Sequence, residues 1–379
     1  MKKKLVVLIL ISFFFIPCVS AEDLAPNAKS NILIEESTGK ILYEKNSDEK
    51  RAPASMTKVM SMLLIMEALD NKQISLNDEV TISQNAADMG GSQLFLQPNQ
   101  TAKVEDLLKG IAVASGNDAV VAMAEKIAGS EEKFVDMMNK KAKELGLKNT
   151  QFKNPHGLDE EGHYTSAHDM AIMAKELIKH KNILNYTSIY EEYLTKSDGT
   201  KLWMVNTNKL VKFYKGVDGL KTGFTQTAGY CLTATAMKNN TRLISVVMGE
   251  DTSANRSTDT VNLLNYGFNS YKVNTIIKKE KNIAKVKVNK GKEDKVYIRT
   301  KENVNELLNV NEKAKKYILV PEVKNITAPV KVGEKVGILK IKYQNKVVKE
   351  VDLTVSKNIK KANLWDLFKR NLKMIVSGK

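Results

Sequence analysis

Alternating apolar and polar positions predict β-hairpins at three places in the first 270 residues. The segment 30–46, "SNILIEESTGKILYEKN", contains two apolar strands on either side of the turn "STGK". The same pattern recurs in 190–206, where "DG" marks the turn, and in 229–250, where "KNN" marks it. These hairpins predict an antiparallel sheet.

Apolar residues at helical spacing predict helices between and after these hairpins. A long apolar run, "VMSMLLIMEAL", follows Ser55, and residues 104–180 are mostly of helical pattern. Ser130 is typical of an N-cap, and "SANRSTDTVNLLNYGF" (253–268) predicts a further helix. The sequence therefore predicts an α/β (α+β) domain in which helices cover an antiparallel sheet.

From about residue 275 the pattern changes to short Val/Ile/Lys alternations, which predict a small all-β domain. The chain then ends in a segment with apolar residues at helical spacing on one face, namely Leu364, Leu367, Phe368, Leu372 and Ile375. Lys369, Arg370 and Lys373 flank that face and Trp365 lies at its edge. We interpret this segment as an amphipathic membrane anchor, the alternative being a helix that docks on the β domain.

The N-terminus has the features of a secretory signal peptide. Three lysines, a short apolar run and the small-residue site "VSA" predict removal of residues 1–21. One cysteine, Cys231, then remains, so that no internal disulfide can form. The predicted domains are 22–272 (mixed, catalytic), 273–357 (β-rich) and 358–379 (anchor helix).

The positive charge is confined to the C-terminal part of the chain. Residues 273–379 contain 27 Lys and Arg against 11 Asp and Glu, which accounts for the whole formal charge of +16. In an exported protein this distribution favours an anionic membrane surface over nucleic acid as the partner. We expect the protein to lie outside the cytoplasmic membrane and to attach peripherally to its outer face.

Three short motifs occur in order: "SMTK" at 55–58, "SGN" at 115–117 and "KTG" at 221–223. The pattern Ser-x-x-Lys also starts at Ser37, Ser47 and Ser130, but only the copy at Ser55 leads into a long apolar run. "SGN" lies in a break between two helical segments, and "KTG" lies on a predicted strand. Together the three motifs predict a cleft between helices and the sheet.

These residue types suit acyl transfer. Ser55 and Lys58 are three residues apart, so on a helix the lysine side chain can reach the serine hydroxyl. Lys58 can remove the hydroxyl proton if burial and a second cation, Lys221, favour its neutral amine. A helix N-terminus also leaves the backbone N–H of Ser55 free for a developing oxyanion. Ser115 could pass a proton to the leaving amine, and Asn117 could hold a substrate amide.

The motifs and their flanks, "ASMTKVM", "VASGNDA", "HYTSAHDMA" and "VDGLKTGFTQTAGYCLTATA", resemble the low-molecular-mass penicillin-binding proteins. These are the penicillin-binding protein 5-like serine D-alanyl-D-alanine carboxypeptidases of bacterial cell walls. The resemblance covers residues 25–270 and implies the serine β-lactamase/transpeptidase-like fold. It also implies removal of the terminal D-Ala from peptidoglycan stem peptides and covalent inhibition by β-lactams.

The resemblance implies catalytic roles for matching residues. Ser55 would be the nucleophile acylated by the penultimate D-Ala, and Lys58 its base. Ser115 and Lys221 would assist proton transfer. The backbone N–H groups of Ser55 and Phe224 would form the oxyanion hole.

The resemblance further implies a substrate-binding set. Asn117 and Thr222 would bind substrate, next to Phe224. Gly223 lies on a predicted strand, where the lack of a side chain would let a ligand backbone approach. Arg256 is the candidate for the substrate's terminal carboxylate, because its planar guanidinium offers two hydrogen bonds. The alternative for Arg256 is a solvated charge on a helix.

Departures from the class A β-lactamase signature favour a carboxypeptidase. "SGN" replaces Ser-Asp-Asn, and no Glu-x-x-Leu-Asn lies between Asn117 and Lys221. Penicillins are therefore expected to be released slowly. An endopeptidase or transpeptidase would share the acyl-enzyme, and a degenerate relative that only binds cell-wall peptide or penicillin remains an alternative.

A zinc peptidase is the rival enzyme class, with His156, Asp159, His163 and His168 as possible ligands. No His-Glu-x-x-His is present, and Gly157 and Gly162 predict a flexible loop instead. Neither a metal nor another cofactor is expected.

Overall fold

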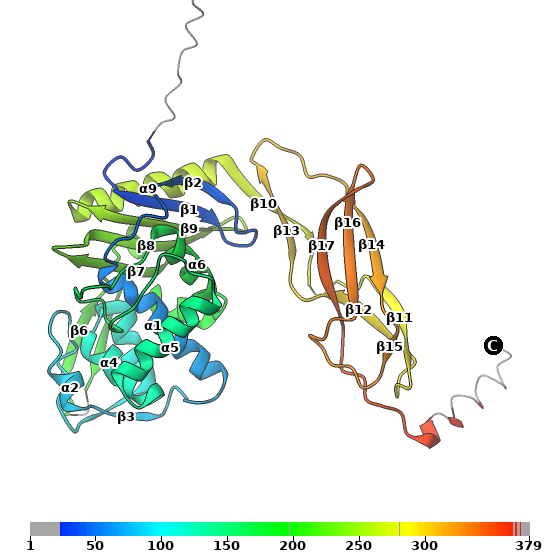
Figure 1. Cartoon of the computed structure of the whole chain (residues 1–379), viewed down its shortest axis with the longest axis horizontal. Coiled ribbons are helices and arrows are strands. Elements are labelled where there is room, and N and C mark those ends of the chain that lie inside the picture. The colour runs from blue at the N-terminus through cyan, green and yellow to red at the C-terminus, as the bar shows by residue number, and fades with distance from the viewer. Residues whose placement is uncertain (1–22, 197, 280, 367, 370–371, 373–379) are drawn as a thin grey trace, which may run out of the picture.

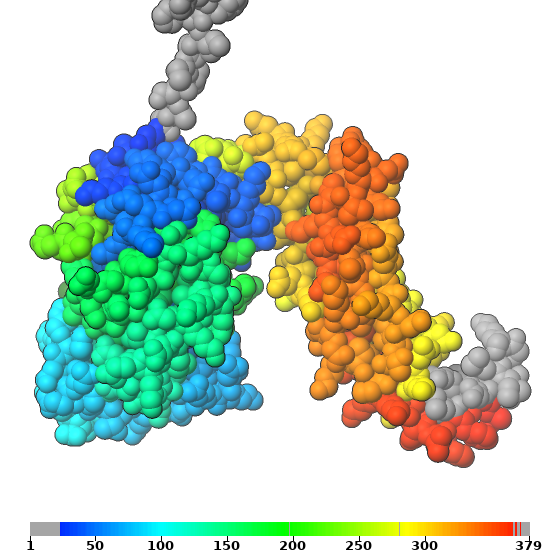
Figure 2. Space-filling view, in the orientation of Figure 1, coloured from blue at the N-terminus to red at the C-terminus, as the bar shows by residue number. Residues whose placement is uncertain are grey.

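The computed structural model of the protein describes residues 23–196, 198–279, 281–366, 368, 369 and 372. These residues form a mixed domain that ends with α9 (Ser253–Ser270) and a β domain that begins with β10 (Tyr271–Ile277) (Figure 1). Figure 2 shows the two domains as separate bodies that meet next to this junction. Across it, the N–H of Val273 donates a hydrogen bond to Thr241 Oγ1 at 2.9 Å.

The mixed domain is built on a five-stranded antiparallel sheet in the order β2-β1-β9-β8-β7. Its strands are β1 (Ser30–Glu35), β2 (Ile41–Lys45), β7 (Val217–Thr225), β8 (Gly229–Lys238) and β9 (Thr241–Glu250). The first strand pairs with the last, so that Asn31 lies opposite Val247. At the other end of the order, β7 is an edge strand and leaves one side of its backbone without a neighbouring strand of this sheet.

Helices cover both faces of this sheet (Figure 1). The helix α9 packs on one face, where Leu263 and Leu264 join the buried side chains of β8 and β9. The larger set covers the opposite face: α1 (Lys58–Asp70), α3 (Val104–Lys109), α4 (Asn117–Ala128), α5 (Glu131–Glu144) and α6 (Ala167–Leu177). Ten of the 13 residues of α1 are buried, as expected for a helix that is apolar on all sides.

Shorter elements connect these parts. They are η1 (Ala54–Thr57), β3 (Glu79–Thr81), α2 (Gln84–Ala87), β4 (Thr101–Lys103), η2 (Gly110–Ala114), η3 (Lys181–Ile183), α7 (Leu184–Thr187), β5 (Glu191–Thr195), β6 (Lys201–Val205) and α8 (Leu210–Phe213). The pairs β3-β4 and β5-β6 form two-stranded antiparallel ribbons.

The second domain consists of strands around a separate apolar core. A six-stranded sheet has the order β14-β16-β17-β12-β11-β15, and β10 pairs with β13. The bounds are β11 (Ala284–Asn289), β12 (Lys295–Thr300), β13 (Val304–Asn309), β14 (Ile318–Val323), β15 (Ile326–Thr327), β16 (Gly337–Tyr343) and β17 (Lys346–Val355). This core extends to Ile359, which pairs with Val330.

The structure confirms the three predicted hairpins, the helix over 253–268 and the all-β character of the second domain. Ser130 is the N-cap of α5, as predicted, and Cys231 is buried in the core. The predicted signal peptide lies outside the described residues. Of the predicted anchor helix, the described residues 364–366, 368, 369 and 372 are helical. None of the helices within the described ranges has the length and apolar character needed to cross a membrane.

Candidate active site

The first motif lies on a tight turn that leads into the central helix. Ser55 is on the 3₁₀ turn η1, and α1 begins at Lys58. Lys58 is completely buried, and its Nζ lies 3.0 Å from Ser55 Oγ. The same Nζ donates to Asn117 Oδ1 and to the carbonyl oxygen of His156, each at 2.7 Å. The serine and the lysine are thus in direct contact, as the spacing of three residues predicts.

The second motif lies at an irregular junction between two helices. The π-helical turn η2 ends at Ala114 and is followed by Ser115, whose φ of 65° and ψ of 29° are left-handed, and α4 begins at Asn117. The amide of Asn117 is fixed at both ends, because its Nδ2 donates to the carbonyl oxygen of Gly90 at 2.6 Å. Its oxygen therefore faces Lys58, and the "SGN" segment lies beside the "SMTK" turn.

The third motif lies on the edge strand β7. The side chain of Lys221 is buried, and its Nζ donates to the carbonyl oxygen of Thr222 at 3.0 Å. A Cβ atom on Gly223 would lie 2.8 Å from the carbonyl oxygen of Pro53 and 3.0 Å from Ala54 Cβ. This glycine therefore lets β7 lie directly against the backbone next to η1, the turn that carries Ser55.

The remaining predicted residues surround this centre. Thr222 Oγ1 donates to Thr207 Oγ1 at 2.7 Å, and the ring of Phe224, 47% exposed, packs on Tyr230 with a centroid distance of 4.2 Å. Arg256 is only 7% exposed. The alternative of a solvated helix charge is therefore wrong for Arg256.

The electrostatic environment of the two lysines favours their neutral forms. Burial, followed by the positive charge of Lys221, holds the pKa of Lys58 well below its ordinary value. Burial, followed by the charge of Arg256, lowers the pKa of Lys221 to about 7. The sequence analysis expected this influence of Lys221 on Lys58, and the structure adds Arg256 as the third cation.

Asp118 is a buried carboxylate of the site that was not predicted from the sequence. Asp118 follows the "SGN" motif directly and accepts hydrogen bonds from the backbone N–H groups of Leu94 and Leu96 at 2.8 and 3.2 Å. It thereby holds the segment 90–96 against the start of α4. Its negative charge raises the pKa of Lys58, in opposition to burial and Lys221. The sequence pattern that could have indicated Asp118 is an acidic residue in the first turn of a predicted helix, where the helix dipole favours a negative charge.

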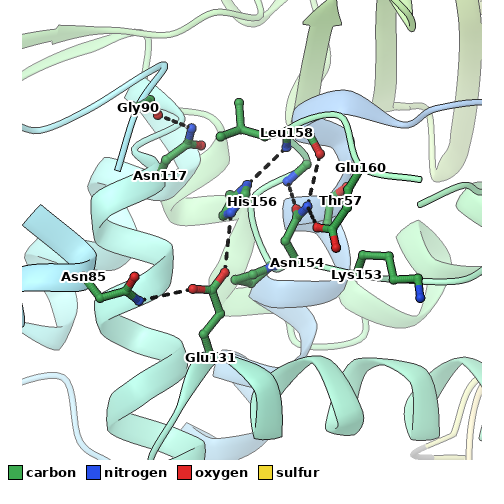
Figure 3. Close-up of polar contacts among 12 residues, drawn as sticks. Thr57, Asn85, Gly90, Asn117, Glu131, Lys153, Asn154, His156, Leu158 and Glu160 are labelled. Carbon is green, nitrogen blue, oxygen red and sulfur yellow. Dashed lines mark hydrogen bonds and ion pairs between the residues drawn. The ribbon is translucent and has the colours of Figure 1, made fainter. Parts of the chain in front are cut away.

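The histidine-containing segment 152–165 packs against η1, the turn that carries Ser55 (Figure 3). Lys153 N–H donates to His163 Nδ1 at 3.0 Å, so the ring proton is on Nε2, which lies 2.8 Å from Thr57 Oγ1. Burial lowers the pKa of His163 to about 4. The prediction of a loop is confirmed, since no helix or strand lies within 152–163, and His156 and Gly157 are buried within it.

Among the described residues, no cluster of His, Cys, Asp and Glu has the arrangement of a metal site. The ring nitrogens of two of the histidines considered as zinc ligands have protein partners instead. His156 accepts at Nδ1 from Leu158 N–H at 3.1 Å, and its Nε2 lies 3.4 Å from Glu131 Oε1.

A serine hydroxyl in contact with a buried lysine of low pKa, next to a free strand edge, defines an active-site serine enzyme of the acyl-transfer class. The comparisons agree with this class. Residues 18–252 match the family model described as D-alanyl-D-alanine carboxypeptidase, and residues 271–361 match the penicillin-binding protein 5 C-terminal domain. The chain belongs to this D-alanyl-D-alanine carboxypeptidase family of serine peptidases, and its activity is serine-type D-Ala-D-Ala carboxypeptidase activity.

Individual relatives cover nearly the whole chain. The D-alanyl-D-alanine carboxypeptidase DacF of Bacillus subtilis is 52% identical over 92% of this chain and 90% of its own length. DacC of Escherichia coli is 36% identical, with 93% and 92% covered. The crystal structure of penicillin-binding protein 5 from Haemophilus influenzae has a TM-score of 0.71 and 32% identity, with 90% of this chain and 100% of that chain covered.

Proposed function

We propose that Ser55 is the nucleophile of the carboxypeptidase reaction and Lys58 its general base. The observation that carries this proposal is the 3.0 Å contact between Lys58 Nζ and Ser55 Oγ, with the lysine completely buried. Since burial and the charge of Lys221 disfavour the ammonium form, the neutral amine is available to take the hydroxyl proton. Ser55 Oγ then forms a bond to the carbonyl carbon of the penultimate D-Ala.

The tetrahedral intermediate carries a negative charge on the former carbonyl oxygen. We assign its stabilisation to the backbone N–H groups of Ser55 and Phe224, which belong to η1 and the adjacent edge strand β7. As the C–N bond breaks, the leaving amine of D-Ala takes up the proton, and Ser115 and Lys221 are the residues proposed to relay it. Water then hydrolyses the acyl ester and restores Ser55.

Specificity for a C-terminal D-Ala requires recognition of a carboxylate. Arg256 is buried near Lys221, whose pKa its positive charge lowers, and its guanidinium provides the charge that attracts such a group. We propose that Arg256 and Thr222 bind this carboxylate, while Asn117 holds the substrate amide. Gly223 contributes by allowing β7 to lie directly against the nucleophile turn.

Mass spectrometry after a short penicillin treatment tests the nucleophile. We expect one covalent adduct per protein, on the peptide that contains Ser55, because a β-lactam traps the acyl-enzyme. The solved complexes of penicillin-binding protein D2 from Listeria monocytogenes with ampicillin and cefotaxime, 32% and 33% identical to this chain, support this expectation.

The rate of adduct formation should rise with pH through the lowered pKa of Lys58 and then level off, since only the neutral amine is a base. Release of D-Ala from a synthetic peptide that ends in D-Ala-D-Ala provides the parallel readout. An adduct on another serine, or no adduct on a protein that releases D-Ala, would overturn the assignment of Ser55.

We also propose that the C-terminal segment attaches the enzyme to the outer face of the cytoplasmic membrane. Leu364 is 87% exposed, and Trp365, Phe368 and Leu372 are exposed as well. Lys369 Nζ lies 5.4 Å from the ring centroid of Trp365, so a cation adjoins the apolar side chains. Apolar side chains next to cations are the composition that binds anionic lipid surfaces.

Removal of residues 363–379 tests this attachment. We expect the shortened protein to lose binding to vesicles that contain anionic lipid and to keep its rate of D-Ala release. The cut is placed after Ala362 because Ile359 belongs to the core of the β domain. Undiminished sedimentation of the shortened protein with such vesicles would contradict the proposal.

A further inference from the structure

The segment 152–165 contacts one face of the turn and helix that carry the nucleophile. Its contacts reach Ala54, Thr57, Lys58 and Ser61, whose spacing of three, one and three residues is that of a single helical face. A Cβ on Gly157 would lie 1.9 Å from the carbonyl oxygen of Ala54, so this glycine is already in close contact with the turn.

Three hydrogen bonds add to this contact. His163 Nε2 lies 2.8 Å from Thr57 Oγ1, and Ser61 Oγ donates to the carbonyl oxygen of Pro155 at 2.6 Å. Between them, Lys58 Nζ donates to the carbonyl oxygen of His156 at 2.7 Å. The segment therefore supplies a partner to the proposed base itself.

The three oxygen atoms around Lys58 Nζ determine where the lone pair of its neutral amine points. A neutral amine has two N–H bonds and one lone pair, and a carbonyl or amide oxygen can only accept. The oxygens of His156 and Asn117, each 2.7 Å from Nζ, therefore take both N–H bonds. The lone pair then points at the third neighbour, Ser55 Oγ, from which the proton must be removed.

The imidazole of His156 is held in place independently of its carbonyl group. Nδ1 accepts from Leu158 N–H at 3.1 Å, which places the ring proton on Nε2. Nε2 lies 3.4 Å from Glu131 Oε1, and the other oxygen of Glu131 accepts from Asn85 Nδ2 at 3.2 Å. Figure 3 shows this chain of contacts running from α2 through α5 to the histidine segment.

We propose that His156, held by Glu131, is a positioning residue for the reaction. Its carbonyl oxygen orients the lone pair of Lys58 toward Ser55, and its imidazole keeps that carbonyl in place. This inference rests on the proposed role of Lys58 as general base. In this proposal both side chains act through Lys58, because the carbonyl group of His156 contacts Lys58 Nζ and Glu131 holds the imidazole of His156.

Kinetics of penicillin acylation of the full chain test the inference, because they separate the non-covalent dissociation constant from the first-order acylation rate. We expect His156→Ala to lower the acylation rate by about 10- to 100-fold, the effect of misplacing a catalytic group by up to about 1 Å. The dissociation constant should stay within about twofold, and the whole protein should still become labelled, since the lone pair of Lys58 contributes to the covalent step alone.

Conservative variants separate positioning from folding. His156→Asn keeps an acceptor for Leu158 N–H and should lose less rate than His156→Ala. Glu131→Ala should also lower the rate, and Glu131→Gln, whose amide oxygen still accepts from the imidazole, should recover most of it. These variants keep the test decisive if His156→Ala does not fold.

His180→Ala is the matched control. The ring of His180 also pairs with a carboxylate, that of Asp70 at 2.6 Å, but Asp70 is the last residue of α1. Twelve residues of helix place that end about 18 Å from Lys58. The acylation rate of this variant should equal that of the wild type.

Two results would overturn the inference. One is complete labelling of His156→Ala and Glu131→Ala at the wild-type rate. The other is a smaller labelled fraction that reacts at the wild-type rate, which would mean that His156 serves folding only. A wild-type protein that forms no adduct at Ser55 would instead overturn the proposed function, so the two failures are distinguishable.

Discussion

Ser55→Ala is expected to lower the rate of D-Ala release by on the order of 10⁴-fold or more, because removal of a nucleophile stops the covalent route. The fold should remain nearly intact. Ser55 is half-buried, and its hydroxyl contacts the amine of Lys58, which keeps the oxygens of Asn117 and His156 as partners. The measurements are D-Ala release, penicillin labelling and the thermal unfolding midpoint.

Ser130→Ala is the matched control, since Ser130 also begins a Ser-x-x-Lys sequence. Its hydroxyl accepts from Lys133 N–H at 3.3 Å and caps α5. Loss of the cap should cost about 1 kcal/mol of stability and reduce turnover far less than Ser55→Ala does, since the Ser55 hydroxyl is kept. Substantial turnover by Ser55→Ala, at a level comparable with this control, would show that another residue is the nucleophile.

Gly157→Ala is the second substitution with a large expected effect. The φ of Gly157 is +92°, and the added Cβ would lie 1.9 Å from the carbonyl oxygen of Ala54 and 2.8 Å from Thr57 Oγ1. The atoms nearest to the added Cβ belong to the backbone of Ala54, which cannot rotate away as a side chain could. Either the segment 152–165 or the turn η1 therefore has to move. We expect a loss of about 3–5 kcal/mol in the free energy of unfolding.

The same displacement should lower D-Ala release by about 100-fold, since the contacts of the segment with Lys58 and Thr57 would change. Gly162→Ala is the control in the same loop. Its φ is +81°, but the nearest atom to its added Cβ is the flexible Lys153 Cε at 3.1 Å. It should lose only about 1–2 kcal/mol, from the backbone conformation. Equal unfolding midpoints for the two variants would contradict the steric argument.

Much of the fold could be predicted because local chemistry specifies it. The turn between β8 and β9 illustrates this, since Asn239 and Asn240 both have positive φ, at 47° and 63°. Two such residues in a row suit the tight turns that match the twist of a hairpin, and asparagine tolerates them. The sequence "KNN" therefore predicted the position of the turn, and with it the ends of the two strands that the turn connects.

The set of candidate site residues was also accessible from sequence, because serine, lysine and asparagine side chains carry the proposed chemistry. The structural reasons behind several of them were not. Gly223 is required by the approach of Pro53, and the burial of Arg256 depends on how α9 packs. Both depend on contacts between residues far apart in the chain.

The positioning contacts were the least accessible part of the site. Lys58 is held by the backbone oxygen of His156, and Asp118 is held by the backbone N–H groups of Leu94 and Leu96. Every residue has these backbone groups, so they leave no mark on composition or spacing. Only the tertiary structure shows which of them are used.

The position of β1 inside the sheet, between β2 and β9, affects the order in which the chain can fold as it is synthesised. Pairing of β1 with β9, and of Asn27 with Asp259 across 232 residues, requires both ends of the mixed domain at once. A chain that emerges N-terminus first cannot complete this sheet until the last strand has also emerged. If residues 1–21 direct export, as their pattern predicts, this sheet would close only after translocation, and the domain would cross the membrane before it folds.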